Sequence, residues 1–133
     1  MLIGEVARAA AVEVSTVRFY ERRGLVRPTG RTTGNYRQYA EDTPLTVRFI
    51  RRAQRLGFTL AEVAPVLALR LVPDSVLREV LAAKRADLDQ RIADLERMRD
   101  AIDRLAAEGV DPDAPCPVVA SLATAGPWRS EGR

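Results

Sequence analysis

The sequence predicts a mainly α-helical protein with a small N-terminal head over residues 1–72, followed by a long helix over residues 73–108. In the head, short segments carry apolar residues at three- and four-residue spacing and are separated by glycine and proline, which indicates several short helices. In the long segment, leucine and isoleucine recur every seven residues, which is typical of a coiled coil. Residues 109–133 then contain a proline-rich loop, a short apolar segment and a loose charged end.

Two short helices begin the head. Apolar residues lie on one side of residues 3–10, and a second helix starts near Val14 or Ser15 and ends at Gly24, a residue type that favours helix C-termini. Residues 11–13 form so short a connection that the two helices are expected to cross steeply, as in a helix-turn-helix. The plain alternative is a surface helix with solvated arginines.

In a helix-turn-helix, the second helix enters the major groove of DNA with its first residues nearest the bases. The sequence therefore predicts DNA contacts at Ser15, Thr16 and Arg18.

A β-ribbon, or wing, is expected after these helices. Proline and glycine mark residues 28–34 as a loop with a turn near Gly34, and Tyr36 and Tyr39 then flank Arg37. Tyrosine hydroxyls and an arginine at this place are suited to contact phosphate oxygens, which position a protein on the duplex without reading its sequence. The alternative is a loop that the tyrosines brace against the core.

Two further helices complete the predicted head. One spans residues 41–56, and its four arginines form either a second phosphate-facing patch or a solvated face. The other starts at Thr59, which forms a capping box with Glu62, and Pro65 is expected to kink or break it. The four arginines of the first are Arg48, Arg51, Arg52 and Arg55.

The long helix carries an apolar stripe that a single chain would leave exposed. Its start is marked by residues 73–75, and Met98 and Leu105 fill positions beside the stripe. Burial of such a stripe against a copy of itself predicts a homodimer, with parallel and antiparallel pairing both open. The stripe consists of Leu77, Leu81, Leu88, Ile92, Leu95 and Ile102.

The charge is unevenly distributed along the chain. Residues 1–58 contain 11 basic and 5 acidic side chains, whereas residues 59–133 contain 10 basic and 13 acidic ones. Six of the seven aromatic residues also lie in the first part. A basic, aromatic head joined to a mildly acidic remainder indicates a nucleic-acid-binding domain with a separate assembly or sensing element.

Composition excludes several other classes of protein. The chain has no histidine and a single cysteine, Cys116, so a disulfide framework and a Ser-His-Asp or Cys-His catalytic pair are excluded, and no enzymatic activity is expected. The sequence lacks an apolar run of roughly 18 residues and a secretory signal, which predicts no membrane association and a cytoplasmic location. A coiled-coil adaptor for other proteins, with an incidental basic head, is the alternative function.

Taken together, these segments resemble the MerR family of bacterial transcription regulators over nearly the whole chain. The residues that carry the resemblance are Ile3-Gly-Glu-Val-Ala7, Val17-Arg-Phe-Tyr-Glu21 with Gly24-Leu25, Tyr36-Arg37 with Tyr39, and Arg48-Phe-Ile-Arg-Arg-Ala-Gln54 with Leu56-Gly-Phe58.

The resemblance implies a winged helix-turn-helix head and an antiparallel coiled-coil homodimer. It also implies binding to a palindromic operator within a promoter, where an effector makes the protein distort the DNA so that RNA polymerase engages both promoter elements. The DNA contacts that it implies are Ser15, Thr16, Arg18, Tyr20, Tyr36, Arg37 and Tyr39.

The segment from Cys116 to Leu122 resembles the loop and short helix of the metal-responsive branch of this family. Some of those sensors add a cysteine at the start of the dimerisation helix, where this chain has Asp74 and Ser75. One thiolate with carboxylates is a poor site for a soft metal, which prefers several sulfur ligands. A metal ion bound through Cys116, modification of its thiol, an organic effector and a purely structural cysteine all stay open.

Overall fold

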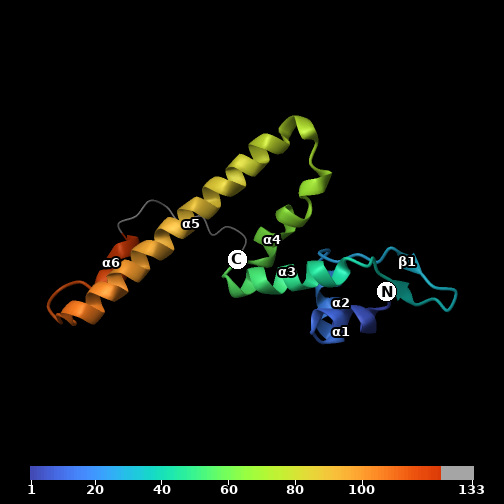
Figure 1. Ribbon diagram of the computed structural model, residues 1–133, viewed down its shortest axis with the longest axis horizontal. Helices are drawn as coiled ribbons and strands as arrows, with labels where there is room; N and C mark the ends of the chain where they lie inside the picture. The colour runs from blue at the N-terminus through green and yellow to red at the C-terminus, as the bar shows by residue number, and fades with distance from the viewer. Residues whose placement is uncertain (124–133) are drawn as a thin grey trace. The chain divides into compact units, whose positions relative to one another are not determined.

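The computed structural model describes residues 1–123, so the predicted loose end of the chain lies outside the described residues. The chain divides after Arg70 into two compact units. Within the head, Figure 1 shows α3 lying across α1 and α2, with the β-hairpin projecting away from the helices. The elements of the head are α1 (Ile3–Ala10), α2 (Val14–Arg22), β1 (Gly30–Arg31), β2 (Arg37–Gln38), α3 (Thr43–Arg55) and α4 (Leu60–Leu67).

The turn between α1 and α2 confirms the predicted helix pair. Ala11 adopts a left-handed conformation with φ 57°, and the N–H of Val12 still donates to the carbonyl of Ala7, which closes α1 tightly. At the far end of α2, Gly24 has φ +76°, a backbone conformation that glycine adopts without steric cost. The next N–H, of Leu25, donates to the carbonyl of Tyr20 and satisfies the helix end.

The head is built around small aliphatic side chains from three helices. Val6 of α1, Val17 of α2, and Val47 and Ile50 of α3 are fully buried. Helices α1 and α2 pack against each other, and α3 packs across α1. The burial of these residues leaves the opposite faces of α2 and α3, which carry the arginines, in solvent.

Helix α4 confirms the capping box and shows that Pro65 does not break the helix. The N–H of Thr59 donates to Glu62 at 2.9 Å, and the N–H of Glu62 donates back to the Thr59 hydroxyl at 3.2 Å. The helix continues through Pro65 and ends two residues later, before a short 3-10 turn at Leu69–Leu71. Pro65 has no backbone N–H, so one helical hydrogen bond is missing at this position. Because the helix ends two residues later, only a short stretch of helix follows the missing bond.

The wing is a very short hairpin that is tied to the start of the chain. Strands β1 and β2 pair Gly30 with Gln38, and Gln38 also forms a bridge with Leu2. Immediately after β2, the N–H of Tyr39 donates to the carbonyl of Met1 at 2.6 Å. These backbone contacts hold one edge of the wing against the beginning of α1.

The side chain of Tyr39 continues this attachment inside the head. It is 3% exposed, and its hydroxyl donates a hydrogen bond to the carboxylate of Glu21 on α2. Burial, together with the hydrogen bond and the negative charge of Glu21, raises the pKa of Tyr39 to about 12. The neutral phenol is thus the form that the folded head prefers.

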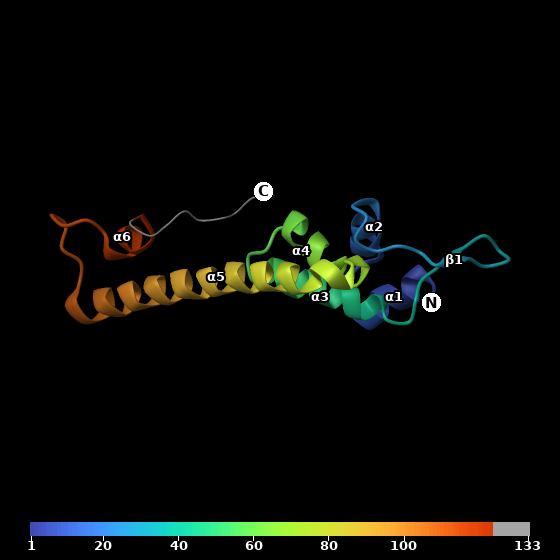
Figure 2. The ribbon, with the colours of Figure 1, turned by 90° about the horizontal axis from the view of Figure 1, so that it is seen from above.

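The second unit contains α5 (Asp74–Glu108) and α6 (Pro117–Ala123), which packs against α5. Figure 2 shows α6 lying alongside the later part of the long helix. The predicted helix start at residue 74 and the predicted short apolar segment are both confirmed. Among residues 1–123, no helix is long and apolar enough to cross a membrane.

Two different stripes run along α5. One contains the buried residues Asp94 and Ala101, with Met98 and Leu105 half-buried beside them. Their spacing of three and four residues places them on one face of the helix. The other stripe remains 45 to 58% exposed and consists of Leu81, Leu88, Ile92, Leu95 and Ile102. Met98 and Leu105 therefore belong to the covered face, and Leu77, at the start of the predicted stripe, is half-buried.

Truncation of Ile50 tests the core. Ile50→Ala removes a fully buried side chain from the middle of α3 and is expected to reduce the free energy of unfolding by about 2–5 kcal/mol. Leu45→Ala, on the same helix at a side chain 64% exposed, is expected to cost less than about 1 kcal/mol. Urea denaturation followed by circular dichroism measures both values. Equal losses for the two variants would contradict this description of the core.

The environment of Tyr39 predicts a loss of stability at high pH. Because the folded pKa of about 12 exceeds the unfolded value near 10, the stabilisation is complete below pH 10 and is lost as the pH rises to about 12. The difference in unfolding free energy between the unaltered chain and Tyr39→Phe should shrink by up to about 2 kcal/mol across this window. A constant difference between the two proteins, measured by denaturant titration at each pH, would show that Tyr39 does not titrate in this way.

Candidate nucleic-acid interface

A basic groove of about 440 Å³ lies between the start of α1, helix α2 and the wing. Four arginines line it, against one carboxylate, that of Glu5. The carboxylate of Glu5 accepts a hydrogen bond from the N–H of Leu2, so it also caps α1. The groove thus has an excess of positive charge, which suits an anionic partner. The four arginines are Arg8, Arg18, Arg31 and Arg37.

The first turn of α2 presents the predicted base-reading residues beside this groove. Ser15 and Arg18 are exposed and Thr16 is half-buried, because Val17 and Tyr20 supply the face of α2 that enters the core. Arg18 itself lines the groove. The structure therefore brings Arg18 together with the predicted wing residues.

The wing presents Tyr36 and Arg37 to the same groove. Tyr36 is 68% exposed, and the Arg37 side chain is 47% exposed although its Nη1 lies 2.9 Å from a carboxylate oxygen of Glu21. Arg31 pairs across the hairpin with Arg37, and its guanidinium donates to the carbonyl of Asn35 at 3.0 Å. Arg31 was not among the DNA contacts predicted from the sequence. Arg31 lies as many residues before Gly34 in the turn as Arg37 lies after it. This symmetry is the signal that would have identified Arg31.

Tyr20 and Tyr39, predicted as DNA contacts, are instead core residues. Each is 3% exposed. The hydroxyl of Tyr20 donates to the side-chain oxygen of Gln54 on α3 at 2.8 Å, and burial raises the pKa of Tyr20 despite the opposing positive charge of Arg51. Both tyrosines hold α2 in place, one against α3 and one against the wing. Their burial gives both side chains a structural role, as the bracing alternative predicts for Tyr39, which also lines the groove.

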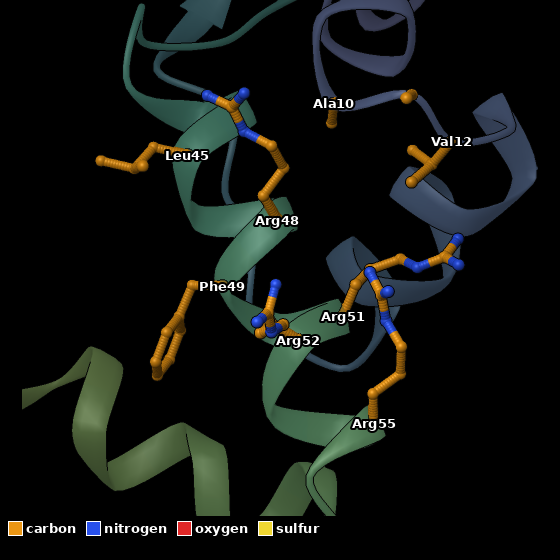
Figure 3. Close-up of a pocket in the computed structure, with 9 residues that line it drawn as sticks. Ala10, Val12, Leu45, Arg48, Phe49, Arg51, Arg52 and Arg55 are labelled. Carbon is orange, nitrogen blue, oxygen red and sulfur yellow. The ribbon is translucent and has the colours of Figure 1, made fainter.

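A second basic surface lies on α3. Figure 3 shows Arg51 and Arg55 leaving this helix on one side and Leu45 and Phe49 leaving it on the other. The four arginines at positions 48, 51, 52 and 55 are exposed, and none forms an ion pair with another described residue. Their charges are thus available to an external anion.

The predicted effector residues do not meet within one chain. Asp74 and Ser75 open α5, and Cys116 follows its other end, just before α6 (Figures 1 and 2). Helix α5 has 35 residues, which corresponds to roughly 50 Å. Cys116 is exposed, and among residues 1–123 there is no group of three side chains suited to hold a metal ion.

Comparison with known proteins agrees with this geometry. The chain is 38% identical to a mercuric resistance operon regulatory protein of Shigella flexneri over 125 residues, which cover 92% of this chain and 87% of the relative. A MerR-family transcriptional regulator from Listeria monocytogenes superposes with a TM-score of 0.61 at 29% identity, covering 81% of this chain and 82% of that one. The transcription regulator PbrR691 from Ralstonia metallidurans, solved with lead(II), gives 0.53 at 30% identity, covering 92% and 98%.

Two family descriptions match the chain directly. "MerR HTH family regulatory protein" matches residues 1–69, which contain the helix-turn-helix, the wing, α3 and α4. "MerR, DNA binding" matches residues 46–105, from α3 through most of α5. The chain therefore belongs to the MerR family of DNA-binding transcription regulators.

Proposed function

We propose that this regulator binds a palindromic operator as a homodimer and distorts the promoter DNA so that RNA polymerase engages both promoter elements. The observation that carries this proposal is the groove in which Arg18 of α2 and Arg37 of the wing face the same space. A helix that reads bases next to a wing that contacts phosphates is the arrangement that a sequence-specific DNA-binding head requires. A cytoplasmic location is part of the same proposal.

The residues of α2, the wing and α3 have separate roles in the proposal. Arg18 reaches base edges in the major groove, and Ser15 and Thr16 contact the DNA from the first turn of α2. Tyr36 and Arg37 bind phosphate oxygens and thereby orient the head. The unpaired arginines of α3 provide a further positive surface for the backbone of the duplex.

The exposed stripe of α5 supports the homodimer. Its five large aliphatic side chains are each about half exposed, and complete burial of one such side chain is worth roughly 1.5–3 kcal/mol. Even half of that amount per residue, summed over two copies, is large against a typical stability of about 5–15 kcal/mol. We assign antiparallel pairing by resemblance to the family.

Antiparallel pairing also supports a position for an effector site. It would bring Cys116 of one copy towards the start of α5 of the other, where Asp74 and Ser75 lie. One thiolate, one carboxylate and one hydroxyl do not match a soft metal ion, which prefers several sulfur ligands. The exposed thiol of Cys116 is therefore the group through which we propose that an effector acts.

Two arginine substitutions separate base reading from phosphate binding. With a duplex that the chain selects from a random pool, Arg18→Ala should weaken binding by about 1–3 kcal/mol and relax the preference for that duplex over a scrambled one. Arg37→Ala should weaken binding to both duplexes and lower the salt-dependence slope by about 1. Gel-shift titrations at several salt concentrations measure these effects.

Arg78→Ala on α5 is the control, since it removes an exposed arginine outside the head. A selected duplex that binds no better than a scrambled one at physiological salt would count against the whole proposal.

A charge placed in the exposed stripe tests the homodimer. Ile92→Asp should convert the dimer to monomer in sedimentation equilibrium and should weaken operator binding at least tenfold, because the two half-sites are then bound independently. Ala86→Asp adds the same charge about 140° around the helix from Leu81 and should leave the dimer intact. Dissociation by both variants, or by neither, would be inconsistent with this interface.

A further inference from the structure

Glu21, near the end of α2, contacts two residues at the base of the wing. Its carboxylate accepts a hydrogen bond from the hydroxyl of Tyr39, and its other oxygen lies 2.9 Å from the Arg37 guanidinium. The side chain of Glu21 is 16% exposed, and that of Arg37 is 47% exposed. A charge pair this close and partly shielded from water is screened less by salt than a surface ion pair.

The wing depends on such attachments because it is small. Each of its strands has two residues, and an isolated two-stranded hairpin is at best marginally stable in water. Backbone contacts with Met1 and Leu2 fasten it to the start of α1. Glu21 attaches the wing to α2, the recognition helix. The contacts of Glu21 therefore help to determine the spacing between that helix and the wing.

The same carboxylate lies close to the base-reading side of α2. Arg18 precedes Glu21 by three residues, which places the two side chains as neighbours on the helix surface. The positive charges of Arg37 and Arg18 both act to lower the pKa of Tyr39, so both guanidinium groups lie within electrostatic reach of its hydroxyl. Glu21 thus pairs with the proposed phosphate contact and neighbours the proposed base contact on α2.

We propose that Glu21 is a positioning residue that sets the sequence specificity of this regulator by holding Arg37 of the wing at a fixed place relative to Arg18. The inference rests on the proposed function of the groove. A phosphate contact held in register strengthens binding most where Arg18 also meets its base, whereas a released arginine binds phosphates of any sequence equally.

Glu21→Gln in the full chain tests this role. The amide can still accept the Tyr39 hydrogen bond, but it has no charge to hold Arg37. Binding to the scrambled duplex should strengthen, binding to the selected duplex should not, and the ratio of the two affinities should fall about fivefold or more.

Glu13→Gln is the matched control, because Glu13 is an exposed carboxylate at the start of α2 whose side chain makes no capping hydrogen bond. Glu13→Gln should strengthen binding to the selected and the scrambled duplex alike. It should change the ratio of the two affinities by less than about twofold, as expected for a general change of charge. An equal change of ratio in the two variants would overturn the proposal.

A double substitution shows whether Glu21 acts through Arg37. In an Arg37→Ala background there is no guanidinium to release, so Glu21→Gln should change the ratio by less than about twofold. If Glu21→Gln still lowered the ratio of the two affinities about fivefold in that background, the role assigned to Glu21 would be overturned.

Tyr39→Phe keeps the buried ring but removes the hydroxyl that orients the Glu21 carboxylate against Arg37. It provides the decisive measurement if Glu21→Gln fails to fold: a ratio lowered in the same direction supports the proposal, and an unchanged ratio contradicts it. Failure of the chain to enrich any duplex from the random pool would refute the proposed function itself. A duplex that is enriched but is discriminated equally well by the Glu21 variants would refute only the inference on Glu21.

Discussion

Burial of one face of α2 is the constraint on which the rest of the head depends. Val17 and Tyr20 enter the core, and the Tyr20 hydroxyl is satisfied by Gln54 of α3. Because the helix has 3.6 residues per turn, fixing these two residues also fixes the direction of Ser15 and Arg18 on the other side. An unsatisfied phenol in the core would cost free energy, so the hydrogen bond helps to specify how α2 rests on α3.

The wing is attached to α2 through the charged side chain of Glu21, whereas α2 is attached to α3 mainly by packing of buried side chains. Glu21 accepts a hydrogen bond from a buried tyrosine and pairs with an arginine that remains half exposed. One carboxylate thereby joins the inside of the head to the surface that we propose faces DNA. Within the segment from Val17 to Glu21, Val17 and Tyr20 enter the core, Glu21 contacts the wing and Arg18 lines the groove.

In the second unit, helix α5 has one face that is buried within the chain and another that is exposed. The stripe with Asp94 and Ala101 is buried within the chain, and the stripe with Leu88 and Ile92 is left exposed. The buried carboxylate of Asp94 is paired with Arg97 at 3.0 Å, as a buried charge requires. The loop that carries Cys116 is therefore connected, through α6 and the covered stripe, to the same helix that supplies the exposed one.

The sequence by itself determined the helices, the turn between α1 and α2, the Thr59 capping box and the start of α5, because periodicity and capping depend on residues a few positions apart. Only the tertiary structure decided which residues the buried hydroxyls of Tyr20 and Tyr39 contact. Their partners lie 34 and 18 residues away, at distances that local patterns do not encode. For the same reason the two stripes of α5 were one pattern in the sequence: an apolar residue is equally suited to a partner within the chain and to one outside it. Only the burial seen in the structure distinguishes the two stripes.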